Sequence, residues 1–428
     1  MTSATTSTSR SDPETGSVWR GQAFRLFFAA ETISAAGTGI GAVALPVVAV
    51  AVLGAGPLAV GLLGAAVWAP WLAFGLLAGV LVDRAPQRPL MIVCDVAAAG
   101  SYLTVPVAAV TGVLGIGQLV VVALVAGSVN VLSEATRQTY PPLIVTDDHL
   151  PAANSSLQAA ESAAEVTAAP GSGLLTHLFG AVAGITANAL SFVVSAVLLL
   201  LVRTPDTPHD QGPAPRSTGI RDDVIAGLRI VISDPWLRTS ATAAGVANFV
   251  LTGVGTLQAL LLIRTVGVPA GWFGPLLLGE AAGGLAGAAL AIRLGARIGT
   301  CRAVVLLAVT GPIAGLLIAA TGPGVALIFF VLGSTASTAA IVGTNVLQAV
   351  FRQRYVPREV LGRVTASTRV IAYSAAPLGA LTAGTLAAAF GTRLAVASLL
   401  TVGVGRGLLF LRAPWRTARE LPTDRLAS

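Results

Sequence analysis

The chain has 428 residues, of which 54% are hydrophobic and 11% are charged, and its formal net charge is +7. Typical soluble domains contain about a quarter of charged residues. Here long apolar blocks recur, and each block suffices for the roughly 20 helical residues that cross a bilayer. These values exclude a soluble enzyme and predict an all-α membrane protein.

The apolar blocks predict twelve transmembrane helices in two sets of six. The Ser/Thr-rich residues 1–23 precede them and are predicted to be a disordered cytoplasmic tail. We expect an N-terminal six-helix bundle at 24–202, a C-terminal bundle at 236–412 and a second cytoplasmic tail at 413–428. The helices are expected at residues 24–53, 57–82, 89–111, 115–137, 151–176, 179–202, 236–263, 271–293, 302–320, 324–349, 359–388 and 392–412.

The connection at residues 203–235 separates the two sets. It opens with a Pro-rich stretch, after which Ile220, Val224, Leu228 and Val231 recur at steps of three and four residues. This spacing places apolar side chains on one face of a helix. We therefore predict an amphipathic helix that lies on the membrane surface.

The arginines indicate the orientation of the chain. All 26 basic residues are arginine, and of those in loops only Arg264 and Arg393 fall on the side away from the termini. Because basic residues concentrate in cytoplasmic loops, both termini are predicted to be cytoplasmic, in the inner (plasma) membrane of the cell. The net positive charge is then a sign of topology, and we expect no nucleic-acid partner.

Two segments are repeated between the halves. Residues 79–84, after the second predicted helix, resemble residues 296–299 after the eighth, and residues 168–173 of the fifth helix resemble residues 375–380 of the eleventh. Two repeats with a binding site between them at the middle of the membrane are typical of secondary transporters.

The loop after the second helix carries a resemblance to a known family. Its pattern is Gly79-x-Leu81-x-Asp83-Arg84-x-x-x-Arg88, which resembles the signature of the major facilitator superfamily. The resemblance implies that Gly79, Asp83, Arg84 and Arg88 form a conformational latch, in which Asp83 lies near the amino end of the eleventh helix. On helix three, Asp95 is the expected partner of Arg84. The alternative is that these charged residues only end helices and fix the topology.

The fifth helix carries a second resemblance, to the drug and siderophore exporter branch that includes enterobactin and macrolide efflux proteins. Its residues 150–154 and 169–173 are similar to that branch, and the latter resemble the antiporter motif. Pro170 removes a backbone donor and is expected to kink the helix, while Gly171 and Gly173 permit close helix packing. Ordinary helix packing is the alternative explanation.

Several carboxylates lie within predicted helices. Glu165 and Glu280 lie near the middle of the membrane, where an ionised side chain is costly, so each should face a cavity, pair with a base or hold a proton. Glu161 shares a helix face with Glu165, and Glu31 lies about two turns into the first helix. We expect them to couple transport to protons. Asp95 and Glu134 lie nearer to helix ends.

Arg369 is the expected charge partner of Glu280 or Glu165. A static ion pair is the alternative to proton coupling. The cavity wall is expected to include Asn248, Gln258, Asn345 and Tyr373, while Trp68 and Trp71 face either the lipid or the cavity.

Other chemistries lack support. Without lysine the chain has no phosphate-binding Gly-x-x-x-x-Gly-Lys motif, and its three histidines are scattered, so we expect no metal and no cofactor. The sequence predicts a monomeric, non-enzymatic secondary transporter that exports a small amphiphilic molecule, such as a drug, antibiotic or siderophore-like metabolite, by proton antiport with alternating access. The alternatives are a proton-coupled importer of a small metabolite and a membrane sensor or scaffold that transports nothing.

Overall fold

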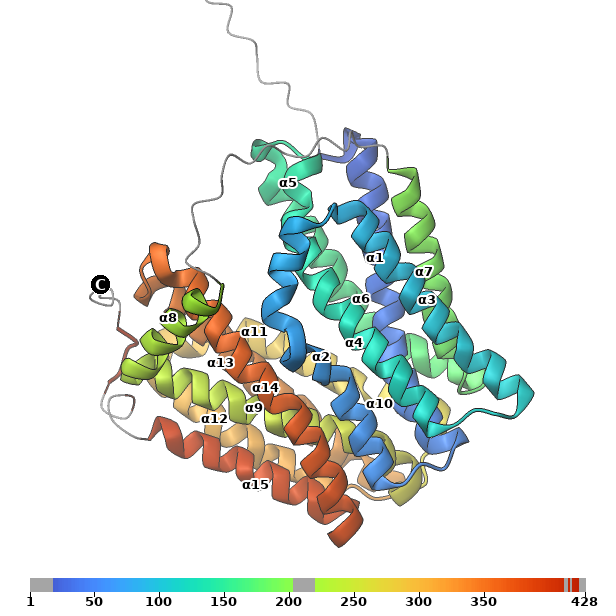
Figure 1. The fold of residues 1–428 in the computed structure, drawn as a ribbon. Coiled ribbons are helices and arrows are strands. Elements are labelled where there is room, and N and C mark those ends of the chain that lie inside the picture. Colours follow the sequence, from blue (N-terminus) through green and yellow to red (C-terminus); the bar gives the residue numbers. More distant parts are fainter. Residues whose placement is uncertain (1–17, 203–219, 412–414, 416–417, 423–428) are drawn as a thin grey trace, which may run out of the picture.

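The computed structural model describes residues 18–202, 220–411, 415 and 418–422, and every regular element in these ranges is a helix (Figure 1). The N-terminal group contains α1 (Gln22–Val47), α2 (Pro57–Arg84), α3 (Gln87–Thr111), α4 (Ile116–Thr139), α5 (Pro141–Ile144), α6 (Leu150–Phe179) and α7 (Ala183–Leu201). The C-terminal group contains α8 (Ile220–Ser233), α9 (Pro235–Ala259), α10 (Ala270–Leu276), α11 (Leu278–Ile298), α12 (Thr300–Gly315), α13 (Ile328–Tyr355), α14 (Arg358–Phe390) and α15 (Thr392–Phe410). Single turns of other helix types extend or precede them, at Val18–Arg20, Val48–Val52, Asp147–His149, Leu260–Val266, Leu316–Ala320 and Gly324–Leu327.

Eleven spans in the described residues are long and apolar enough to cross a membrane. The further long helix is α6, which has 30 residues and packs against α1 and α10. The helix expected at 271–293 is divided into α10 and α11 at Leu277. Pro275 lies just before this break and has no backbone N–H to continue the helical ladder.

The chain ends differ from the expected tails. Residues 18–23 were included in the disordered N-terminal tail, but Val18–Arg20 forms a helical turn and α1 begins at Gln22. The ring of Trp19 lies 5.4 Å from that of Phe24 and 4.8 Å from that of Phe28, centroid to centroid. This aromatic contact explains the early start of the helix. The predicted tail at residues 1–17 and the Pro-rich stretch at 203–219 lie outside the described residues.

The amphipathic segment forms α8, and it packs against α14 and α9. Gly227 lies so close to α14 that a Cβ there would collide with the backbone of Arg363. Val231 is buried in the C-terminal group. Helix α8 is therefore amphipathic, and it also packs against the helices of the C-terminal group.

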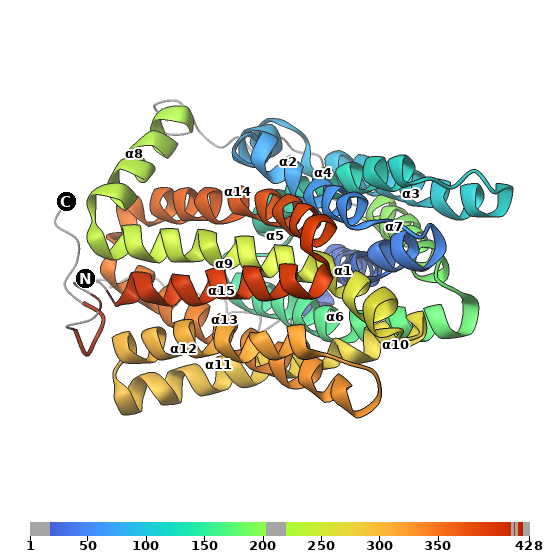
Figure 2. The same cartoon turned by 90° about the horizontal axis from the view of Figure 1, so that it is seen from below.

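The two groups of helices meet along α2 and α14 and along α6 and α10 (Figures 1 and 2). We call the end of the molecule where α1 begins and α15 ends the terminal face, and the other end the opposite face. In Figure 1 the end of α2 and the start of α14 lie apart, whereas their other ends lie close together, so that the two helices diverge toward the terminal face.

Glycines bring the two groups together near the opposite face. A Cβ on Gly61 of α2 would lie 2.8 Å from the Cα of Gly384 on α14. A Cβ on Gly173 of α6 would lie 2.5 Å from the Cδ of Pro275 on α10. Arg264 adds a hydrogen bond of 2.9 Å from Nη1 to the carbonyl of Ala55. The groups are thus in backbone contact at the opposite face.

Candidate substrate and proton site

A polar cavity of about 300 Å³ lies within the N-terminal group, between α1, α3, α4, α6 and α7. Its charged lining residues are Glu31, Glu134, Arg137 and Glu161. Hydroxyl and amide groups also line it, from Ser34, Thr38, Asn130 and Ser133. Tyr102 and Phe192 close one side, with stacked rings whose centroids are 6.0 Å apart. We call this cavity the acidic pocket, because three carboxylates share it with one arginine.

Arg137 binds two of these carboxylates. Its Nη2 lies 2.6 Å from Oε2 of Glu134, and its Nη1 lies 2.6 Å from Oε2 of Glu161. Glu134 and Arg137 are three residues apart on α4 and so share a helix face, while Glu161 comes from α6. Gln158 donates a further hydrogen bond of 3.1 Å to Glu161. Arg137 therefore holds α4 and α6 together at the pocket.

Glu31 is the third carboxylate, and it projects from α1 into the same pocket. Within the described part of the chain, no basic side chain lies within 4.0 Å of it and it makes no hydrogen bond. The charges of Arg137, Asp95, Glu134 and Glu161 all act on Glu31 through space. Because it has no direct counter-ion at this depth, its charge is best compensated by a proton or by a positively charged ligand.

Asp95 lies behind the pocket on α3 and is 5% exposed. Ser195 of α7 lies beside its carboxylate, while Oδ2 has no hydrogen-bond partner in the described structure. The predicted partner was Arg84, whose side chain lies outside the described residues. The pairing of these two residues stays a prediction.

Arg369 extends to the acidic pocket from the other group of helices. Its Nη1 lies 3.7 Å from Oε1 of Glu134, and its side chain is 49% exposed. We had expected Arg369 to pair with Glu280 or Glu165. Glu280 instead accepts a hydrogen bond of 2.5 Å from Nε2 of Gln258, and the side chain of Glu165 lies outside the described residues.

Glu280 occupies the first turn of α11, immediately after the break from α10. The free N–H groups of a helix start favour a carboxylate there, which accounts for its position in physical terms. Gln258, expected to line the substrate cavity, is bound to this carboxylate. Glu280 and Gln258 belong to α11 and α9, so their contact stays within the C-terminal group.

Three aromatic side chains meet between the groups, on the opposite-face side of Arg369. The ring of Tyr373 on α14 lies 5.7 Å from that of Trp68 and 4.7 Å from that of Trp71, both on α2. Tyr373 and Arg369 are four residues apart and share one face of α14. Both tryptophans therefore contact the other group of helices, and neither lines the acidic pocket.

The placement of two asparagines in the wall of a substrate cavity stays a prediction. Asn248 donates to the carbonyl of Ala244 on its own helix, at 3.0 Å, and Asn345 is exposed on α13. The sequence reasoning missed a buried hydrogen bond of 2.8 Å from Ser240 to Gln348. It also gave Glu134 and Arg137 no role at the site, although a Glu and an Arg three residues apart are a recognisable helical pair.

The expected latch is described only in part. Gly79, Asp83 and Arg84 belong to α2, but the side chains of the latter two lie outside the described residues. Arg88 donates from Nε to the carbonyl of Leu199 and from Nη2 to that of Leu200, each at 2.9 Å. Arg88 thus binds the last carbonyls of α7, a position that favours a cation.

In the fifth membrane helix, Pro170 lies inside a helix that continues through it. Gly171 faces Ile40 of α1, since a Cβ there would lie 3.8 Å from its Cδ1. Gly173 faces α10 of the other group. The small residues of α6 therefore lie where α1 and α10 pack against it.

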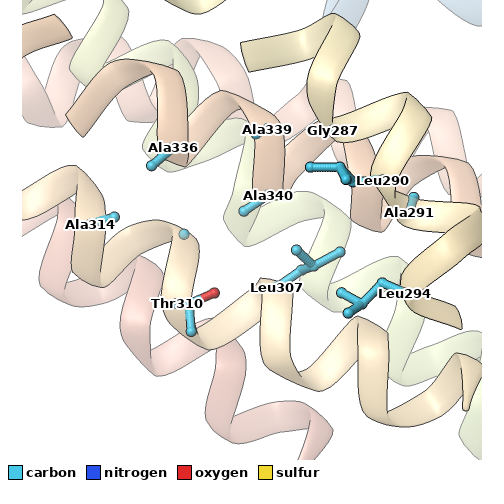
Figure 3. Close-up of a pocket in the computed structure, with 11 residues that line it drawn as sticks. Gly287, Leu290, Ala291, Leu294, Leu307, Thr310, Ala314, Ala336, Ala339 and Ala340 are labelled. Carbon is cyan, nitrogen blue, oxygen red and sulfur yellow. The ribbon is translucent and has the colours of Figure 1, made fainter. Parts of the chain in front are cut away.

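A second hollow of about 270 Å³ lies within the C-terminal group, between α11, α12 and α13 (Figure 3). Figure 3 shows leucine and alanine side chains around it, with the hydroxyl of Thr310 among them. The residues that line this hollow include no ionisable group.

Comparison with known proteins identifies the family. Residues 27–380 match the family described as "Major Facilitator Superfamily". The chain is 27% identical over 427 residues to the "Multidrug efflux pump Tap" of Mycobacterium tuberculosis, covering 94% of this chain and 95% of that protein. The protein of the same description from Mycolicibacterium fortuitum is 28% identical over 392 residues, covering 87% and 90%.

Among solved structures, the nucleoside transporter NupG superposes with a TM-score of 0.74 at 12% sequence identity, over 91% of this chain and 98% of that one. At this identity the likeness concerns the fold. It confirms the predicted all-α membrane fold, while the match of residues 27–380 to the family confirms the predicted family.

Proposed function

Because the chain belongs to the major facilitator superfamily of membrane transporters, we propose that it exports a small amphiphilic molecule in exchange for protons. The observation that carries this proposal is the acidic pocket, where Glu31 has no direct counter-ion among the described residues while Arg137 binds both Glu134 and Glu161. The similarity to multidrug efflux pumps over nearly the whole chain supports export rather than import.

Glu31 is the proposed proton carrier. An ionised carboxylate at this depth is costly without a partner, so Glu31 is stable either when it is protonated or when a substrate occupies the pocket. The two ligands then compete for one side chain. Competition of this kind produces exchange, because the substrate must leave before the proton binds.

Arg369 couples this competition to the movement of the two groups. It reaches Glu134 across the interface, at 3.7 Å, while Arg137 holds the same carboxylate from within the N-terminal group. When Glu31 is ionised, the pocket carries excess negative charge and attracts Arg369 more strongly. When Glu31 is protonated or a cationic group enters, this attraction weakens and the groups rock more easily.

The arrangement of the two groups supports a pathway that opens at the terminal face. Near the opposite face the groups touch through Gly61 and Gly384 and through Gly173 and Pro275. We propose that the terminal face is cytoplasmic, as the arginine distribution predicts, and that the substrate enters the acidic pocket from there. Closure at the terminal face and separation of the glycine contacts then release it on the other side.

The test is accumulation of a panel of labelled amphiphilic compounds in efflux-deficient cells that express the chain. We expect lower accumulation of at least one compound, reversed by a protonophore and abolished by Glu31→Gln. Asp148→Asn is the matched control, since Asp148 is exposed and lies outside the pocket. Raised accumulation identifies an importer and contradicts the proposed direction.

A further inference from the structure

The amino end of α12 is bound by residues that follow α15, near residue 420. The residue that precedes α12 is Gly299, which has no side chain to cap the helix. The carboxylate of Glu420 accepts instead, from the N–H of Thr300 at 3.2 Å and from its hydroxyl at 2.9 Å. The N–H of Cys301 donates to the carbonyl of Arg419 at 3.2 Å. The first N–H groups of α12 are therefore satisfied by a segment about 120 residues away in sequence.

The same segment is anchored by an aromatic side chain. Trp415 is 1% exposed, and its ring lies 4.8 Å from that of Phe410 on α15 and 5.1 Å from that of Trp236 on α9. It also packs 6.0 Å from Phe351 of α13. Leu421, 8% exposed, joins the same cluster. We call Trp415 and residues 418–422 the C-terminal strap.

Gly299 shows that the fit between strap and helix is specific. Its φ is +99°, a conformation that residues with a side chain rarely adopt. A Cβ at this position would also collide with the carbonyl of Arg419. The turn before α12 therefore requires glycine both for its backbone angle and for the space that the strap occupies.

We propose that the C-terminal strap is the helix cap of α12 and that its docking holds the terminal-face ends of α9, α12, α13 and α15 in one rigid unit. The free N–H groups and the dipole of a helix start favour a carboxylate, which Glu420 supplies, and burial of Trp415 adds apolar contact with three of these helices. Alternating access moves whole helix groups against each other, so a strap across the ends of one group keeps its helices together during that movement. This inference depends on neither the substrate nor the proton.

A native cysteine reports on the strap. Cys301 is fully buried, belongs to the same cluster as Trp415 and Leu421, and donates its backbone N–H to the strap. Cys94, the other cysteine of the chain, lies in the core of the N-terminal group. In purified protein with Cys94→Ala, the rate at which a maleimide modifies Cys301 therefore measures release of the strap.

We expect Glu420→Ala to speed labelling of Cys301 by about 2- to 30-fold, the range that corresponds to loss of a helix cap. Glu420→Gln keeps an acceptor and should have a smaller effect, while Trp415→Ala should also speed labelling. The matched controls are Asp148→Ala and Trp272→Ala, which remove exposed side chains of the same kinds.

Labelling of Cys94 in a Cys301→Ala background separates release of the strap from general unfolding. The proposal requires the labelling rate of Cys94 to stay unchanged in the strap variants. It is overturned if Cys301 is labelled at the wild-type rate in both Glu420→Ala and Trp415→Ala. It is also overturned if Cys94 is exposed to the same extent as Cys301, because the whole protein has then opened.

Discussion

The contact between Gly61 and Gly384 predicts that one added methyl group opens the opposite face. In the structure, a Cβ on Gly384 would lie 2.9 Å from both the Cα of Gly61 and the carbonyl of Pro57. Both neighbours are backbone atoms, which cannot rotate away as a side chain can. Ordinary contact begins at 3.4 Å, so in Gly384→Ala the helices α2 and α14 must separate by about half an ångström.

The expected size of the effect follows from this collision. Overpacking of a close contact costs about 1–3 kcal/mol, and only the arrangement with the opposite face closed contains this contact. The ratio of open to closed opposite face should therefore rise by about 5- to 150-fold. The collision is absent once the groups have rocked apart.

The assay uses Thr256→Cys as a reporter, with Cys94 and Cys301 replaced by alanine. Thr256 of α9 lies against Gly64 of α2, across the interface, so a cysteine there becomes accessible to a bulky maleimide when the groups separate. We expect Gly384→Ala to raise the labelling rate of this cysteine by about 5- to 150-fold.

Gly405→Ala is the matched control, because a Cβ at Gly405 meets no atom within 4 Å. Equal labelling rates in Gly384→Ala and Gly405→Ala would refute the reasoning. The melting temperature of both variants should be compared, since a large fall in Gly384→Ala alone would indicate loss of folding rather than rocking.

Three further predictions concern charged side chains. Glu31→Gln should abolish proton-driven export and also slow exchange of substrate across the membrane, as measured by counterflow in proteoliposomes, because the proton and the substrate compete for this carboxylate. A double-mutant cycle of Glu134→Gln and Arg369→Gln, measured by thermal unfolding, should give a coupling energy of about 0.2–1 kcal/mol. The value is small because the two side chains lie 3.7 Å apart and Arg369 is half exposed. A coupling energy near zero would show that Arg369 does not couple the pocket to the movement of the groups. Arg88→Ala should lower the free energy of unfolding by about 1–2 kcal/mol, because two carbonyls of α7 lose a charged donor, whereas the exposed Arg393→Ala should leave it unchanged.

The helices could be predicted because long apolar segments have few alternatives in a membrane. A segment such as 89–111 must form a helix to satisfy its own backbone groups, and the structure has α3 at Gln87–Thr111. The break between α10 and α11 was missed, although Pro275 marks it. The N-terminal turn was missed because the sequence does not show that Trp19 contacts Phe24 and Phe28.

The partners of charged residues were harder to predict, because they depend on how helices face one another. Glu161 was recognised as a carboxylate on the same helix face as Glu165, but its pairing with Arg137 joins α6 to α4. Arg369 was recognised as a deep base, yet its partner Glu134 belongs to a helix that had been assigned no such role. Hydropathy places residues at a depth along each helix, and it carries little information about rotation around the helix axis.

The C-terminal strap was also not predicted from the sequence. Residues 413–428 are polar and follow the last apolar block, so they were expected to be a tail. The structure shows that Trp415 and Leu421 are buried and that Glu420 caps α12. Trp415 was the available sign, since a tryptophan in a polar tail usually contacts the rest of the protein.

The most direct test of proton-coupled export at the acidic pocket is proton movement in proteoliposomes that contain the purified chain and a trapped pH-sensitive dye. With a compound identified by the accumulation panel, our account predicts that adding substrate to one side drives protons to that side in the wild type. It predicts no such movement in Glu31→Gln and an unchanged response in Asp148→Asn. Substrate transport without proton movement, or an undiminished proton flux in Glu31→Gln, would contradict it.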